Sequence, residues 1–122
     1  MQPLALVCYE RLLPGSHLVN RLQDLNYRVL SLSDVSRLSA TAQRESPLLV
    51  FIDLQSSADV CGAIAALKAT PPLAHLPVVA FAPDNAPDLL ASAQSAGASI
   101  AVSETAIIQH LSQFIDQALL VD

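Results

Sequence analysis

The residue best suited to chemistry in this chain is Asp53, which directly follows the apolar run 48–52. Pro47 precedes this run, and Val50 and Ile52 lie within it, so residues 48–52 are predicted to form a strand buried on both faces. Asp53 then lies at the carboxyl end of a central strand, where open α/β sheets hold their sites.

The sequence offers few other catalytic or metal-binding patterns. His17, His75 and His110 fall on different predicted elements and have no partner at ligand spacing. The serines at 56–57 have no histidine placed to act as their base. The three glycines form no dinucleotide-binding fingerprint. Two cysteines, Cys8 and Cys61, give neither a disulfide framework nor a metal-ligand spacing.

Composition narrows the class of protein further. With 122 residues, 52% of them apolar and 14% charged, the chain can build one well-packed domain, expected to span residues 1–122. The formal net charge is −5 and the six basic residues are scattered, which argues against a nucleic-acid partner. No apolar run approaches the ~18 residues of a membrane span. The N-terminus lacks a signal peptide, so we expect a cytoplasmic protein without membrane contact.

Hydrophobic periodicity predicts strands that alternate with helices. Short apolar runs predict strands at 4–8, 28–32, 48–52, 78–81 and 99–102. Amphipathic stretches predict five helices, at about 16–26, 35–45, 60–69, 87–96 and 107–119. Ser33 and Asp34 are expected to cap the second helix. Asn26 and Gly97 are expected to end the first and fourth helices.

Strict alternation of strand and helix implies an α/β fold, with a doubly wound five-stranded parallel sheet flanked by five helices. For five strands the common order is the flavodoxin-like 2-1-3-4-5, in which the first and third strands are neighbours. Glu10, just after the first strand, should therefore meet Asp53 at the rim of the sheet.

Five segments give the chain its resemblance to the receiver domain of two-component response regulators, and they extend over nearly all of its length. These segments are residues 6–10, Asn26-Tyr27, residues 47–54, residues 76–81 and residues 96–99. The resemblance implies the CheY-like form of the fold. It also implies that Asp53 occupies the phosphoacceptor position and that acids after the first strand bind Mg²⁺ with it. In such a site the cation balances charge on the phosphoryl oxygens.

The chain departs from the receiver pattern at most of the other functional positions. The acid pair becomes Tyr9-Glu10, and Ala82 replaces the hydroxyl residue that ends the fourth strand. Glu104, or Ser103 if the register slips by one, takes the lysine position, and Ala101 takes that of the switch aromatic. Near a phosphoryl dianion, a carboxylate at ~4 Å turns an attraction of about 4 kcal/mol into a repulsion of similar size before screening.

These departures favour one of three hypotheses on function. The first is a pseudo-receiver, a stand-alone signalling module that docks on a protein without phosphorylation and is not an enzyme. The second is a phosphorylatable single-domain response regulator that accepts phosphoryl on Asp53, with Mg²⁺ held by Glu10, Asp53 and the Gln55 carbonyl. The third is a doubly wound module that binds a small ligand at the same rim. The first needs no cofactor.

The expected partner is a protein, either a histidine kinase or another signalling protein, and a homodimer is a further prediction. The resemblance implies docking through the fourth helix, fifth strand and fifth helix. On that face Ser92 and Ser95 would allow close approach, and His110 and Gln113 would line the neighbouring helix.

Overall fold

A five-stranded parallel sheet forms the centre of the molecule. The computed structural model describes residues 3–9, 12–33, 37–55 and 60–120. The strands are β1 (Leu4–Cys8), β2 (Arg28–Leu32), β3 (Leu49–Asp53), β4 (Val78–Ala82) and β5 (Ile100–Ser103). They pair in the order β2-β1-β3-β4-β5, and all four pairs are parallel. The fold class and the strand order predicted from the sequence are therefore confirmed.

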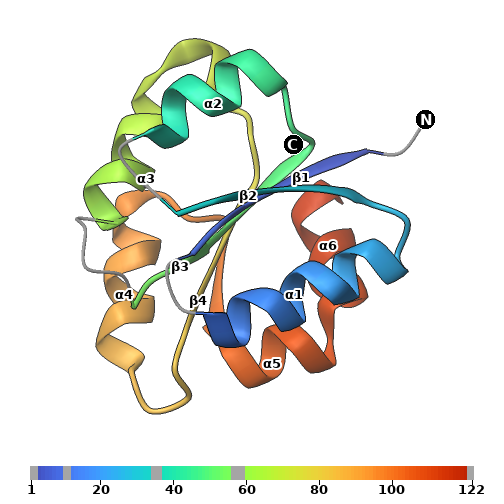
Figure 1. Ribbon diagram of the computed structural model, residues 1–122. Coiled ribbons are helices and arrows are strands. Elements are labelled where there is room, and N and C mark those ends of the chain that lie inside the picture. Colours follow the sequence, from blue (N-terminus) through green and yellow to red (C-terminus); the bar gives the residue numbers. More distant parts are fainter. Residues whose placement is uncertain (1–2, 10–11, 34–36, 56–59, 121–122) are drawn as a thin grey trace.

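Helices cover both faces of this sheet (Figure 1). One layer holds α2 (Leu38–Glu45), α3 (Val60–Ala69), the short 3₁₀ helix η2 (Pro71–Leu73) and α4 (Pro87–Ala96). The other layer holds α1 (Leu12–Asp24), α5 (Glu104–Gln109) and α6 (Leu111–Leu120). The strand ends that carry Asp53 and Ala82 face the loops that lead into α3 and α4.

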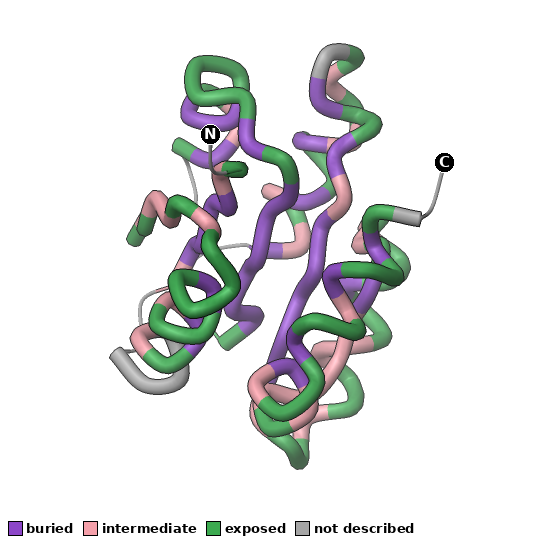
Figure 2. The backbone as a smooth tube through the Cα atoms, turned by 90° about the vertical axis from the view of Figure 1, so that its right-hand side faces the viewer, coloured by how far each residue is buried: buried purple, intermediate pink, exposed green. Residues whose placement is uncertain are grey.

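The sheet separates two hydrophobic cores. Side chains alternate along each strand, so Val50 and Ile52 pack toward the α2–α3–α4 layer while Leu49 and Phe51 pack toward the α1–α5–α6 layer. All residues of β3 and β4 are buried, as a parallel sheet covered on both faces requires. Buried segments accordingly run through the centre of Figure 2, with exposed helix surfaces on either side.

Helix ends follow the sequence signals in most places. Pro87 begins α4, where its missing N–H costs nothing, and Gly97 ends it with φ of 117°. Asn26, just past α1, has φ of 70°, so both expected left-handed positions are confirmed. The cap of α2 was predicted wrongly. Its N-cap is Arg37, which makes no side-chain cap hydrogen bond, and Asp34 lies outside the described residues.

The C-terminal stretch differs from the prediction of one helix from 107 to 119. Two helices, α5 and α6, replace it, and His110 (φ −123°, ψ 33°) separates them. The described part of the chain thus holds six α-helices rather than five. The break leaves no trace in the hydrophobic pattern, because Ile107, Leu111 and Ile115 remain buried on one continuous stripe.

Lys68 joins three segments of one layer. Its ammonium donates hydrogen bonds to the carbonyls of Leu76 and Ala74, in the connection to β4. Its aliphatic stem lies under Gly97, where a Cβ atom would stand 3.0 Å from Lys68 Cγ. Burial lowers the pKa of this amine from its ordinary value. Lys68 therefore connects α3 with the start of β4 and the end of α4.

Candidate functional site

Asp53 ends β3 and lies almost entirely out of solvent, with 1% of its surface exposed. Its Oδ1 accepts a hydrogen bond from the backbone amide of Gln55 at 3.0 Å. This contact is an Asx turn, in which an aspartate closes the loop that follows it. Opposite Asp53, Phe81 of β4 is the register partner and is fully buried. The buried carboxylate of Asp53 therefore holds the backbone of the residues that directly follow β3.

The structure describes only part of the predicted Mg²⁺ set. Glu10 lies outside the described residues, so its distance from Asp53 stays a prediction. Gln55 is exposed beside the buried carboxylate of Asp53. Across the described ranges, no three His, Cys, Asp or Glu side chains gather closely enough to hold a metal ion. The described donors therefore do not make a magnesium site on their own.

Three further residues singled out from the sequence, Ala82, Ser103 and Glu104, lie at the ends of β4 and β5 and at the start of α5. Ala82 is fully buried and pairs in register with Ser103. Ser103 ends β5, and its Oγ accepts a hydrogen bond from the Ala106 amide, which caps α5. Glu104 then forms the first residue of α5 and is half-buried. The Ser103 hydroxyl thus serves the fold locally.

Tyr9 and Ala101, the other two residues that depart from the receiver pattern, both pack against the hydrophobic cores. The Tyr9 amide donates to the Leu32 carbonyl at 2.9 Å and its side chain packs on the α1–α5–α6 core. Ala101 lies half-buried in β5 and packs toward the opposite core. An alanine there has no ring to swing between inner and outer positions.

One hydrogen-bonded pair at this rim was not foreseen from the sequence. Asp84, two residues beyond β4, accepts from the Thr105 hydroxyl through Oδ2 at 2.6 Å and from the Thr105 amide through Oδ1 at 3.3 Å. The two residues are 21 positions apart. Only the strand order could have indicated this contact, because β4 and β5 are neighbours and the two residues follow the ends of those strands.

We expect the carboxyl of Asp84 to titrate below the ordinary aspartate range. The hydrogen bonds from the Thr105 hydroxyl and amide, with a smaller one from Ser103, lower its pKa. Because the folded-state pKa is depressed, the stabilisation is present above the unfolded-state pKa and is lost as pH falls through the folded-state value. Carbon-detected NMR titration measures this shift, and Thr105→Val should move the midpoint upward.

Thr70→Val supplies the matched control for that titration. Thr70 also donates its hydroxyl to a single acceptor, the Ala66 carbonyl, at 2.9 Å, but it lies after α3. Its substitution should leave the Asp84 midpoint where it is. An Asp84 midpoint that is equal in wild type and Thr105→Val would contradict the assignment of the shift to Thr105.

The four predicted partner-face residues are all exposed but lie on different layers. Ser92 and Ser95 are on α4, whereas His110 and Gln113 follow α5 and belong to the other layer. His110 and Gln113 line a shallow hollow of about 180 Å³ together with Arg21 of α1 and Leu25, the residue that follows α1. The structure therefore brings the second pair next to α1.

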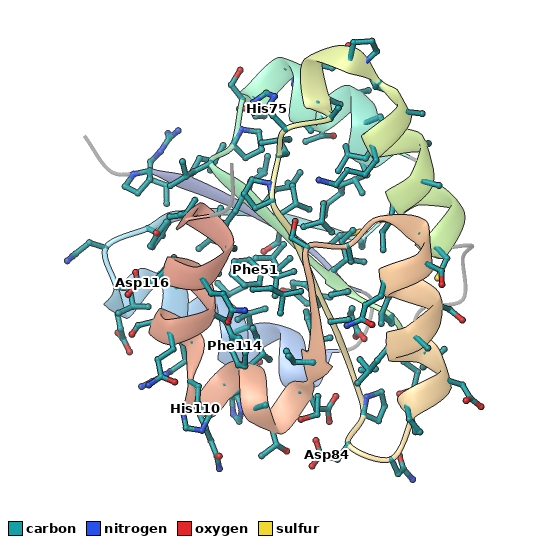
Figure 3. All side chains as sticks on the ribbon, turned by 180° about the vertical axis from the view of Figure 1, so that it is seen from behind. Phe51, His75, Asp84, His110, Phe114 and Asp116 are labelled. Carbon is teal, nitrogen blue, oxygen red and sulfur yellow. The ribbon has the colours of Figure 1, made fainter. Side chains whose placement is uncertain are left out.

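Another hollow, of about 420 Å³, lies at the far end of the molecule. It is lined by residues of α2, of η2 and of the segments that follow each of them: Ala42, Gln43, Ser46, Pro47, Leu73, His75 and Leu76. Figure 3 shows His75 at one end of the molecule and Asp84 at the other. This hollow is thus remote from the rim that carries Asp53.

Among the described residues, no helix has the length and apolar character that crossing a bilayer requires.

Comparison with known proteins identifies the class of fold as that of response regulator receiver domains. The receiver domain of NtrX from Brucella abortus superposes with a TM-score of 0.83 at 21% identity, covering 97% of this chain and 99% of that one. Chemotaxis response regulator CheY4 of Vibrio cholerae gives 0.83 at 15% identity, over 98% and 100% of the two chains. A protein assigned as a response regulator from Chloroflexus aurantiacus J-10-fl gives 0.91 at 14% identity, over 99% and 100%.

The chain spans only part of some similar proteins. It covers 27% of a longer NtrX chain from Brucella abortus, at 22% identity and a TM-score of 0.82. No protein-family model and no curated protein matches the sequence. At these identities the likeness carries the fold, and function has to be argued from this chain's own residues.

Proposed function

We propose that this chain is a pseudo-receiver, a signalling module of the two-component type that docks on a protein partner without being phosphorylated. The observation that carries the proposal is the state of Asp53, a residue that is 1% exposed and whose Oδ1 accepts a hydrogen bond from the Gln55 amide. A nucleophile needs its attacking oxygen within reach of the donor in an aligned geometry. Asp53 would have to become accessible to a phosphoryl donor before it could attack phosphorus.

The surroundings of Asp53 also support a role without phosphorylation. A phosphoryl group needs preorganised donors or a metal to balance the charge that develops on its oxygens. Ala82 has no hydroxyl to give, and the Ser103 hydroxyl accepts from the Ala106 amide and contributes a smaller hydrogen bond to Asp84. The Thr105 hydroxyl, one residue beyond Glu104, donates to Asp84. Each of these two hydroxyls already has a partner within the fold.

The proposed partner is a histidine kinase or another signalling protein, and a second copy of the chain is an alternative occupant. The surface of α4 supports close docking because Ala91, Ser92 and Ser95 are small and exposed. The neighbouring surface of β5 is half-exposed from Ala101 to Ser103. Small side chains let a second backbone approach, and they lose little entropy on ordering. Docking would use the fold as a fixed scaffold, with no catalysis by this chain.

Intact-mass analysis after incubation with Mg²⁺ and acetyl phosphate tests the proposal. We expect no mass gain in the wild-type protein over a time that fully labels a receiver domain of known competence in a parallel tube. Circular dichroism on the same sample establishes that the fold is retained. The expected absence of labelling follows from the closed Asp53 carboxylate and from the missing hydroxyl at Ala82.

Asp53→Asn is the matched control, because it keeps the size of the side chain and removes the nucleophilic carboxylate. A gain of one phosphoryl group in the wild type that is absent from Asp53→Asn would overturn the proposal. It would establish the alternative, a phosphorylatable single-domain response regulator that uses Asp53 with Mg²⁺. A gain that persists in Asp53→Asn would place the label on another residue: Asp53 would still not be the phosphoacceptor, but docking without phosphorylation would be contradicted.

A further inference from the structure

We propose that Asp84 and Thr105 form a permanent clasp that holds the β4–α4 loop against the start of α5. The clasp would preset the surface made by α4, β5 and α5 in one arrangement. This inference rests on the proposed function, since a module that docks without phosphorylation needs its surface already shaped. The clasp would take the place of a loop movement driven by a phosphoryl group.

The geometry of the pair supports a clasp rather than a passing surface contact. Both carboxylate oxygens of Asp84 are used, and Thr105 supplies two donors, its hydroxyl and its amide, beside a smaller contribution from Ser103. A two-point contact fixes orientation as well as distance, and hydrogen bonds to a charged acceptor are the stronger kind. The amide donor is part of the first turn of α5, where backbone N–H groups have no partner within the helix. Asp84 therefore also acts on the helix end.

Both strands that carry the clasp are anchored nearby. Ala82 and Ser103 pair across β4 and β5 immediately before the two loops begin. Ser103 caps α5 through Ala106, and the Ala86 amide closes the β4–α4 loop onto the Pro83 carbonyl at 3.1 Å. Three contacts thus hold the β4–α4 loop: the pairing of β4 with β5 before it, the turn from Pro83 to Ala86 inside it, and the bond from Thr105 to Asp84. The start of α4 follows directly at Pro87.

Residue-resolved amide hydrogen exchange by NMR measures the clasp directly. In Thr105→Val, the amides at positions 105, 106 and 86 should exchange about two- to thirteenfold faster, the factor expected for losing one net hydrogen bond. Asp84→Ala, which removes both acceptor oxygens, should give at least as large an increase at the same amides. Thr105→Ser keeps the hydroxyl and should restore wild-type rates at Ala86. Thr70→Val, which removes another Thr hydroxyl bond, should change none of them.

The double variant Asp84→Ala/Thr105→Val separates a shared contact from two independent ones. Because Asp84→Ala already removes both acceptor oxygens, a clasp predicts that the double variant exchanges no faster than Asp84→Ala alone. Multiplied effects, or unchanged exchange at Ala86 in both single variants, would overturn the clasp. Phosphoryl labelling of wild-type Asp53 would overturn the proposed function but not the clasp. The exchange rates test the clasp alone, so the two failures can be distinguished.

Discussion

Replacing Phe51 with alanine should destabilise the protein by about 3–5 kcal/mol, the usual cost of emptying a fully buried phenylalanine site. Phe51 lies in the middle of β3, with Val7 of β1 and Val79 of β4 as its register neighbours. Its side chain is fully buried in the core under α1, α5 and α6. Since a domain of this size is stable by about 5–15 kcal/mol, the loss would consume much of the total.

Urea denaturation followed by circular dichroism measures this loss. Phe114→Ala is the matched control, because it removes the same ring from a partly exposed position on α6 that packs against the same core. We expect Phe114→Ala to cost less than half as much, since a partly exposed ring leaves no closed cavity. Equal losses at the two positions would contradict the assignment of Phe51 to the centre of this core. Figure 3 labels both side chains, which belong to the core between the sheet and the α1–α5–α6 layer.

The second large effect is expected at Gly97, where alanine should lower the free energy of unfolding by about 1–2 kcal/mol, or more, from the left-handed backbone alone. Gly97 has φ of 117°, a conformation that L side chains rarely adopt. A Cβ atom would also stand 3.0 Å from Cγ of Lys68, whose ammonium is held by two carbonyls. Lys68 therefore has limited freedom to move away.

Gly62→Ala is the control for this substitution. Gly62 is exposed in the first turn of α3, so alanine there gains helix propensity and should stabilise by about 0.5 kcal/mol. Thermal or urea denaturation of the two variants should thus give changes of opposite sign. A Gly97→Ala variant as stable as wild type would mean that the end of α4 relaxes without strain.

The elements of the sheet could be predicted because their signals are local. β1 and β2 have the predicted bounds, and β3 and β5 are displaced by one residue. Strands buried on both faces read as continuous apolar runs, which leaves their ends less distinct than their centres. The break at His110 could not be predicted, because α5 and α6 bury one uninterrupted stripe and no Gly or Pro marks the boundary.

The candidate site was predictable only in part. The position of Asp53 at the end of a central strand follows from the run before it and from the strand order. Its burial and its turn with Gln55 depend on tertiary packing, which periodicity does not encode. The bond between Asp84 and Thr105 joins two loops distant in sequence, so no local motif announces it.

The strands at the two edges of the sheet bear on whether copies of this protein can pair into fibrils. β2 and β5 lie at the edges of the sheet, and each leaves one side without a strand neighbour among the described residues. β5 has four residues, so an added strand could pair over only about 13 Å. Fibril-forming segments are typically six or seven residues long. A helix begins directly after Ser103, so this edge is too short to template continuous cross-β growth.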